Sequence, residues 1–275
     1  MEKDFRRFLR KELFPSRFCP GCGHGILQGA VLRALDELDW KPEELVFVGG
    51  IGCAGSIATN YFHSDTLHVP HGRAITFASG VKIYKPELKV IVLTGDGDLS
   101  SIGGNHLLHA ARRNIDLTVI CANNGVFATT GGQVAPTTPL GAITATTPEG
   151  NPDEPLDLCE IVRVCGAGYV ARSSVAHPRQ IVQLVKKALL HRGFSFVDVI
   201  STCPVQFGRR NRFKSPFEMI QALKKIGVSM DESKRMEAKE KEAKMIFGEI
   251  YFNPQKIWKG YREDISAASK ENLNG

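Results

Sequence analysis

Apolar residues along this chain follow two alternating patterns, continuous runs and helical spacing. Continuous apolar runs predict buried strands at 45–48, 88–94, 117–122 and 196–200. Apolar positions three or four residues apart predict helices at 25–38, 74–84, 102–113, 157–165 and 178–190. Strands of this kind that alternate with helices are typical of a parallel sheet covered on both faces. We therefore expect an α/β fold with a doubly wound, mostly parallel sheet.

The loops that follow predicted strands are the expected places for function. They span 49–73, 95–101 and 123–150. Binding sites of open α/β sheets gather at the carboxyl ends of the strands. The segment from Asn123 to Pro155 is long and rich in Gly, Thr and Pro, and long loops inside compact domains are usually functional.

Composition narrows the class of protein. The chain has 275 residues, of which 43% are hydrophobic and 23% charged, as is usual for soluble globular proteins. No apolar run approaches the ~18–20 residues that a membrane span needs. The charged start, Met1-Glu-Lys-Asp-Phe-Arg-Arg, lacks the apolar region of a secretory signal. We expect a cytoplasmic protein that does not bind membranes.

The net charge of +6 is concentrated near the end of the chain. Residues 1–208 hold 20 Lys and Arg against 19 Asp and Glu, whereas residues 209–275 hold 15 against 10. We therefore expect a main domain at 1–208, which carries the site described below, and a basic, helical C-terminal extension at 209–275. Mixed charges near 236–244 indicate a solvated helix or a partner surface, and not a nucleic-acid-binding face.

Four of the seven cysteines lie in loops that one sheet edge can bring together. Cys19 and Cys22 precede the first helix, Cys53 follows the first strand and Cys203 follows the last. Iron–sulfur clusters bind four thiolates, often from a close pair and distant single residues. A zinc site, a redox dithiol and plain turn residues remain alternatives. The other cysteines sit in apolar segments, where we expect buried thiols: Cys121, Cys159 and Cys165.

A second set of residues indicates a magnesium–diphosphate site. Asp96, between Gly95 and Gly97, ends one buried strand, and Asn124 ends the next, 28 residues later. Mg²⁺ prefers oxygen ligands and bridges to phosphates, and glycines let the backbone approach a diphosphate. The alternative is a turn and a strand exit without ligand.

The stretch Gly50-Ile-Gly-Cys-Ala-Gly55 matches the dinucleotide-binding pattern, which would make the protein an NAD-dependent dehydrogenase. No long helix clearly follows, and Cys53 occupies the turn. We therefore favour the interpretation that these glycines bring the backbone close to another cofactor and present the cysteine. A non-catalytic metal-binding or interaction subunit is a third hypothesis.

Among the eight histidines, His71 in His-Gly-Arg is the strongest candidate for ligand contact.

Taken together, these motifs resemble a known family. They are Phe18-Cys-Pro-Gly-Cys-Gly-His, Gly52-Cys53, His71-Gly-Arg, Gly95-Asp-Gly-Asp, Asn123-Asn124, Thr130-Gly-Gly-Gln-Val-Ala-Pro-Thr-Thr-Pro and Cys203-Pro-Val-Gln-Phe-Gly-Arg-Arg-Asn. Over about residues 14–212 the chain resembles the β subunit of 2-oxoacid:ferredoxin oxidoreductases, with the 2-oxoglutarate branch as the best match and the 2-oxoisovalerate and pyruvate branches as alternatives.

The resemblance implies a thiamine diphosphate-binding fold with Mg²⁺ and a [4Fe–4S] cluster. The implied cluster ligands are Cys19, Cys22, Cys53 and Cys203. The implied Mg²⁺ ligands are Asp96, Asn124 and the Val126 carbonyl. The implied cofactor-contacting residues are Ile51, Gly52, Cys53, Ala54, His71, Gly95, Asp96, Gly97, Asp98, Asn124, Ala128 and Thr129. His71 and Thr129 would lie at the reaction centre, and Gly131 would shape substrate choice.

The activity implied is CoA-dependent oxidative decarboxylation of a 2-oxoacid to an acyl-CoA, with electrons passed through the cluster to ferredoxin, or the reverse carboxylation. An α subunit would supply the rest of the site, and γ and δ subunits are possible further partners. The family reads Tyr-Gly-Met-Thr where this chain has Phe127-Ala-Thr-Thr, which leaves the choice of oxoacid open.

Overall fold

A seven-stranded sheet forms the centre of the computed structural model, which describes residues 4–241 and 244–260. The strand order is β11-β7-β8-β4-β3-β1-β2, parallel except for β11, which is antiparallel to β7. The α/β fold with a mostly parallel sheet is confirmed. The strands are β1 (Leu45–Gly49), β2 (Asp65–His68), β3 (Lys89–Gly95), β4 (Thr118–Asn123), β7 (Tyr169–Ser174), β8 (Ser195–Ile200) and β11 (Gly248–Phe252).

Helices cover both faces of the sheet. One apolar cluster joins the sheet to α1, α2 and α6, and a second joins it to α3, α4 and α5. The helices of the first face are α1 (His24–Glu37), α2 (Gly55–Tyr61) and α6 (Pro178–Leu190). The helices of the second face are α3 (Ala74–Tyr84), α4 (Gly104–Arg112) and α5 (Leu158–Cys165). Asp157 caps the start of α5 by accepting from the Glu160 N–H, and Gly166 ends it in a left-handed conformation.

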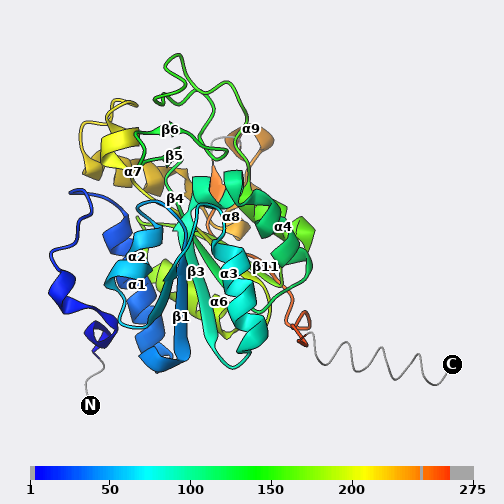
Figure 1. The fold of residues 1–275 in the computed structure, drawn as a ribbon. Helices are drawn as coiled ribbons and strands as arrows, with labels where there is room; N and C mark the ends of the chain where they lie inside the picture. Colours follow the sequence, from blue (N-terminus) through cyan, green and yellow to red (C-terminus); the bar gives the residue numbers. More distant parts are fainter. Residues whose placement is uncertain (1–3, 242–243, 261–275) are drawn as a thin grey trace.

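The loop after β4 rises above the carboxyl ends of the strands (Figure 1). It contains a small antiparallel hairpin and is held together internally by the Asn151 side chain, whose amide donates to the Thr138 carbonyl at 2.9 Å. The hairpin strands are β5 (Val126–Phe127) and β6 (Gln133–Val134). This loop therefore covers the edge at which the sequence predicts function.

The segment after residue 208 contains helices and also completes the sheet. Its helices are α7 (Pro216–Ile226), α8 (Met230–Arg235) and α9 (Ala238–Lys241), and its short strands are β9 (Gly227–Val228) and β10 (Met245–Ile246). Strand β11, which apolar spacing did not predict, pairs with β7 at the edge. Residues 261–275 of the expected extension lie outside the described residues. No helix among the described residues is both long and apolar enough to span a membrane.

Candidate functional site at the carboxyl edge of the sheet

Asp96 and Asn124 lie side by side because β3 and β4 are neighbours, with Gly95 paired to Ala122. Asp96 Oδ1 accepts the Asn124 N–H at 3.1 Å, and Oδ2 accepts the Thr137 hydroxyl at 2.5 Å. Asn124 Oδ1 in turn accepts the Val126 N–H at 3.1 Å. The residues predicted as magnesium ligands thus share one small region.

The Asp96 carboxyl group is buried, with 1% of the residue exposed. Burial raises the pKa of Asp96 to about 6, although hydrogen bonds from Thr137 and Asn124 favour the ionised form. A buried carboxylate that lacks a cationic partner gains most from a bound cation, and carboxylate and amide oxygens suit Mg²⁺. The donor set therefore fits a magnesium ion.

The Asp98 carboxylate joins three loops of this edge. It accepts from the Thr94 hydroxyl at 2.6 Å and from the backbone N–H groups of Gly72 at 2.7 Å and Ile51 at 3.3 Å. It also contacts His71 Nδ1. Because Nδ1 faces a carboxylate, which can only accept, Nδ1 is the nitrogen that donates to Asp98, and Nε2 is left available to a ligand. Asp98 is 3% exposed, so its carboxylate faces these loops and not the solvent, and it holds them in position.

A pocket at this edge brings the predicted cofactor-contacting residues together. Its volume is about 50 Å³, small beside the ~300–1,000 Å³ of complete ligand sites. The described residues that line it include no glutamate. The lining consists of Ile51, Gly52, Cys53, Ala54, His71, Gly95, Asp96, Gly97, Asp98, Asn124, Val126, Phe127, Ala128, Thr129 and Thr130.

Two further residues shape this region: Phe127, which the sequence marks as a departure from the family pattern, and Thr137, whose contact sequence reasoning missed. The Phe127 ring packs edge-on to His71, with centroids 5.9 Å apart, and lies so close to Gly97 that a Cβ there would meet it at 2.6 Å. Thr137 donates to Asp96 from 41 residues away. Phe127 begins the stretch that departs from the family's Tyr-Gly-Met-Thr, whereas Thr137 lies within the quoted Thr130–Pro139 motif, where nothing marks its contact with Asp96. Gly131 lies outside the pocket lining, and its carbonyl accepts from Arg210 at 3.3 Å.

The turn at Gly50–Gly55 runs directly into α2. A Cβ on Gly50 would lie 1.9 Å from the Asp98 carboxylate, and one on Gly55 would lie 2.0 Å from the Gly50 carbonyl. The glycines are therefore required by close packing within the chain. Helix α2, at seven residues, was not predicted.

Four free thiols occupy the loops predicted to converge. The pKa of Cys22 is raised to about 11, mainly by burial, with smaller contributions from the neighbouring thiols of Cys203, Cys53 and Cys19. Burial likewise raises the pKa of Cys203, with Cys53 and Cys19 adding to the effect. These mutual effects place the four sulfurs in one neighbourhood. Hydrogen bonds hold the loops together, since the Thr202 hydroxyl donates to the Gly21 carbonyl at 3.1 Å.

The four thiols are a donor set of the kind that an iron–sulfur cluster uses, which takes one thiolate per iron. Over residues 4–241 and 244–260, no three His, Cys, Asp or Glu side chains are grouped closely enough to share one ion. Cys121 and Cys159 are buried beneath the sheet edge as predicted, and burial raises the pKa of both, whereas Cys165 is half-buried.

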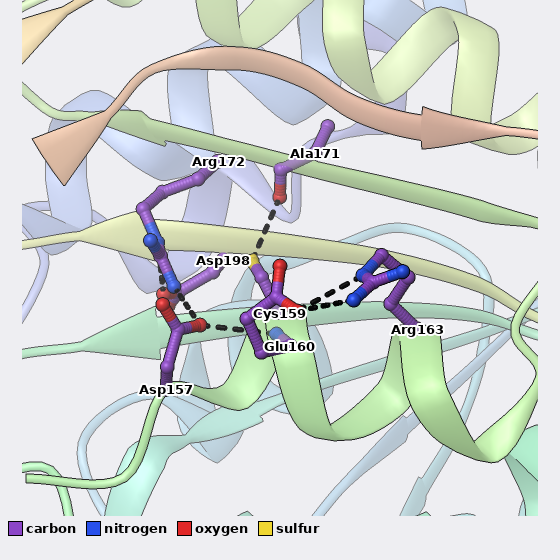
Figure 2. A network of polar contacts seen from close by, with 7 residues as sticks. All are labelled: Asp157, Cys159, Glu160, Arg163, Ala171, Arg172 and Asp198. Atoms are coloured by element: carbon purple, nitrogen blue, oxygen red, sulfur yellow. Dashed lines mark hydrogen bonds and ion pairs between the residues drawn. The ribbon is translucent and has the colours of Figure 1, made fainter. Parts of the chain in front are cut away.

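A polar row crosses the sheet one level below the site. Arg172, Asp198, Cys121 and Thr94 are paired across β7, β8, β4 and β3. Figure 2 shows the Arg172 guanidinium between Asp198, whose Oδ2 accepts from Nε at 3.0 Å, and Asp157. Burial raises the pKa of Asp198, which Arg172 opposes, and the Asp198 charge adds to the raised pKa of Asp96. The strand pattern around Asp198 did not mark this network.

Comparisons with known proteins were made for sequence and for fold. The family of thiamine pyrophosphate enzymes, C-terminal TPP binding domain, matches residues 50–199. The chain is 46% identical to the 2-oxoglutarate synthase subunit KorB of Methanothermobacter thermautotrophicus over 92% of this chain and 88% of that protein. It is also 46% identical to the protein of the same name from Methanocaldococcus jannaschii, over 89% of this chain and 90% of the relative.

A solved structure has the same fold. It is that of a 2-oxoglutarate:ferredoxin oxidoreductase from Magnetococcus marinus with 2-oxoglutarate, coenzyme A and succinyl-CoA bound. The TM-score is 0.83 at 30% sequence identity, over 100% of this chain and 92% of that one.

Proposed function

This chain belongs to the β subunits of the 2-oxoacid:ferredoxin oxidoreductases, in the 2-oxoglutarate synthase branch, and we propose from this premise how its residues serve that enzyme. The reaction is the CoA-dependent oxidative decarboxylation of 2-oxoglutarate to succinyl-CoA, or its reversal. The observation that carries the proposal is that the Asp96–Asn124 pair and the Cys53 loop line one pocket.

Asp96, Asn124 and the Val126 carbonyl would hold Mg²⁺, and Mg²⁺ would hold the diphosphate. Thiamine diphosphate supplies the carbon nucleophile and electron sink for cleavage beside a carbonyl group. Gly97 allows the close packing of its loop against the Phe127 ring, which fills the place of a Cβ, and the following helical turn offers N–H groups at its start. His71 Nε2 can hold or move a proton at the reacting centre, because Asp98 fixes the ring through Nδ1.

Cys19, Cys22, Cys53 and Cys203 would bind the [4Fe–4S] cluster, which supplies one-electron acceptance. Two of the four residues belong to the turn that starts α1, and hydrogen bonds fix this turn to the Cys203 loop. The Gly23 N–H donates to the Thr202 carbonyl at 3.1 Å, in addition to the Thr202–Gly21 bond. The chain thus holds its thiol-bearing loops in place with backbone contacts.

A partner subunit completes the site in this proposal. Relatives of this chain are named as subunits. The pocket is small for thiamine diphosphate, and the described residues that line it do not include the glutamate that thiamine enzymes use at the pyrimidine ring. We therefore assign the missing wall and glutamate to an α subunit, with γ and δ subunits as possible further partners.

An acidic ferredoxin suits the surface next to Cys203. Arg209, Arg210, Arg212 and Lys214 follow that cysteine in the chain and are exposed, with no acidic residue before Glu218. Opposite charges on two proteins speed their encounter and set orientation. This surface is our candidate for the ferredoxin contact, and the partner subunit is the alternative occupant.

The test is activity of the purified complex with different 2-oxoacids. The chain co-expressed with its partner subunit should reduce a viologen dye with CoA and 2-oxoglutarate at a higher kcat/KM than with pyruvate or 2-oxoisovalerate, and the isolated chain should be inactive. Preference for another oxoacid would overturn the substrate, and activity of the isolated chain would overturn the shared site.

A further inference from the structure

Cys53 and Thr129 touch across the floor of the pocket, although 76 residues separate them. The Cys53 N–H donates to Thr129 Oγ1 at 3.0 Å, and Cys53 Sγ lies 3.0 Å from the same oxygen. The preceding residue, Gly52, has a φ of +129°, a backbone conformation that favours glycine and sets the direction of the Cys53 N–H.

The chemistry of the two groups determines the direction of the second contact. The Thr129 oxygen already accepts the Cys53 N–H, while its own hydroxyl hydrogen remains available. A thiolate bound to iron can only accept. The Thr129 hydroxyl therefore donates to Cys53 Sγ whenever that sulfur is a cluster ligand.

We propose that Thr129 is a positioning residue that raises the reduction potential of the iron–sulfur cluster by this hydrogen bond to Cys53 Sγ. The proposal rests on the cluster assigned above. An electron that enters the cluster increases the negative charge on its sulfur ligands, and a hydrogen bond to a ligand sulfur stabilises that charge. Thr129 would therefore favour transfer of electrons from the substrate side of the pocket into the cluster.

Two of the other proposed cluster thiols, Cys22 and Cys203, have backbone partners instead. The His24 backbone forms a hydrogen bond with the Cys22 thiol, and the backbones of Gln206 and Phe207 form hydrogen bonds with the Cys203 thiol. A point substitution does not remove such donors. The donor to Cys53 Sγ is a side-chain hydroxyl, so a single substitution removes it while the cysteine remains. The same substitution also removes the acceptor of the Cys53 N–H, so the iron and sulfide content of each variant has to be measured as well.

The test is a redox titration of the cluster in the assembled holoenzyme, purified anaerobically and followed by electron paramagnetic resonance. Thr129→Val keeps the shape and removes the hydroxyl, and Thr129→Ser keeps the hydroxyl. We expect a lower midpoint potential in T129V and a value near wild type in T129S, at equal iron and sulfide content. Thr129→Ala is a second hydroxyl-free variant for the case in which T129V does not assemble. We expect it to shift the midpoint potential in the same direction.

The outcomes separate this inference from the proposed function. A hydroxyl-free variant that contains the cluster at the wild-type potential would overturn the role of Thr129 alone. A wild-type holoenzyme without an iron–sulfur signal would overturn the cluster assignment and this inference with it.

Discussion

The Asp96 carboxylate accepts the backbone N–H of Asn124 at 3.1 Å, across the boundary between two neighbouring strands. The contact fixes the end of β4 relative to the end of β3. Both side chains thereby face the pocket that also contains Cys53 and Thr129. The proposed magnesium ligands and the proposed cluster loop thus line the same pocket.

Removal of the Asp96 charge should abolish retention of thiamine diphosphate. We expect Asp96→Asn to weaken Mg²⁺-dependent binding at least about 100-fold, since even indirect partners of metal ligands cost 10–100-fold. Binding can be measured by calorimetry on the complex at fixed Mg²⁺. The control is Glu87→Gln, which changes an exposed acidic residue just before the amino end of β3, away from the pocket. Undiminished binding in D96N would contradict the assignment.

The pH dependence of unfolding should contain a term from His24. Burial lowers the pKa of His24 to about 4, whereas an unfolded chain has a histidine pKa of about 6.5. Between these values the unfolded chain binds more protons, so the free energy of unfolding falls as pH decreases from 6.5 to 4, by about 3 kcal/mol in total.

His24→Phe should lack this term. Asp96 contributes the opposite slope between pH 4 and 6, because burial raises its pKa to about 6, so the informative quantity is the difference between wild type and variant. Urea unfolding of the full chain at several pH values measures it. Parallel stability curves for the two proteins would show that His24 is not neutral and buried as described.

Arg172 should stabilise the fold by neutralising Asp198. Arg172→Met leaves a fully buried carboxylate without its cation, which should cost about 3–5 kcal/mol of unfolding free energy. The double variant R172M/D198N removes both charges and should recover much of that loss. Urea unfolding compares the two, and equal destabilisation of the single and double variants would contradict charge pairing as the cause.

The basic segment after Cys203 should matter for a protein acceptor and not for a small dye. Arg209→Gln combined with Lys214→Gln should raise the KM for ferredoxin about tenfold at low ionic strength, with a smaller effect in high salt. The rate with a viologen dye should stay unchanged. Lys85→Gln, exposed at the opposite edge of the sheet, is the control. Loss of dye reduction in the double variant would indicate a role inside the site.

Sequence patterns were sufficient for the sheet and its main helices because the strands β1, β3, β4 and β8 are nearly continuous apolar runs. They failed at β7, which is fully buried but contains Arg172, Ser173 and Ser174. These polar side chains are tolerated inside because each has a partner, as the Ser173 hydroxyl does in Gln180 at 2.6 Å. Such pairing is a tertiary property that no local pattern reveals.

The edge strands escaped prediction for a different reason. Strand β2 exposes most of its side chains, and β11 lies in the charged segment after residue 208. Within the site, motif spacing was enough to place Asp96 beside Asn124. The same spacing could not reveal Thr137, because its contact with Asp96 depends on how the long loop folds back.

In the proposed enzyme, thiamine diphosphate and the cluster share this edge of the sheet. The most direct test is the visible absorbance of the anaerobic complex when 2-oxoglutarate is added without any external electron acceptor. We expect the iron–sulfur absorbance to decrease as substrate electrons enter the cluster. A complex that contains iron and thiamine diphosphate but keeps its absorbance unchanged would contradict this expectation.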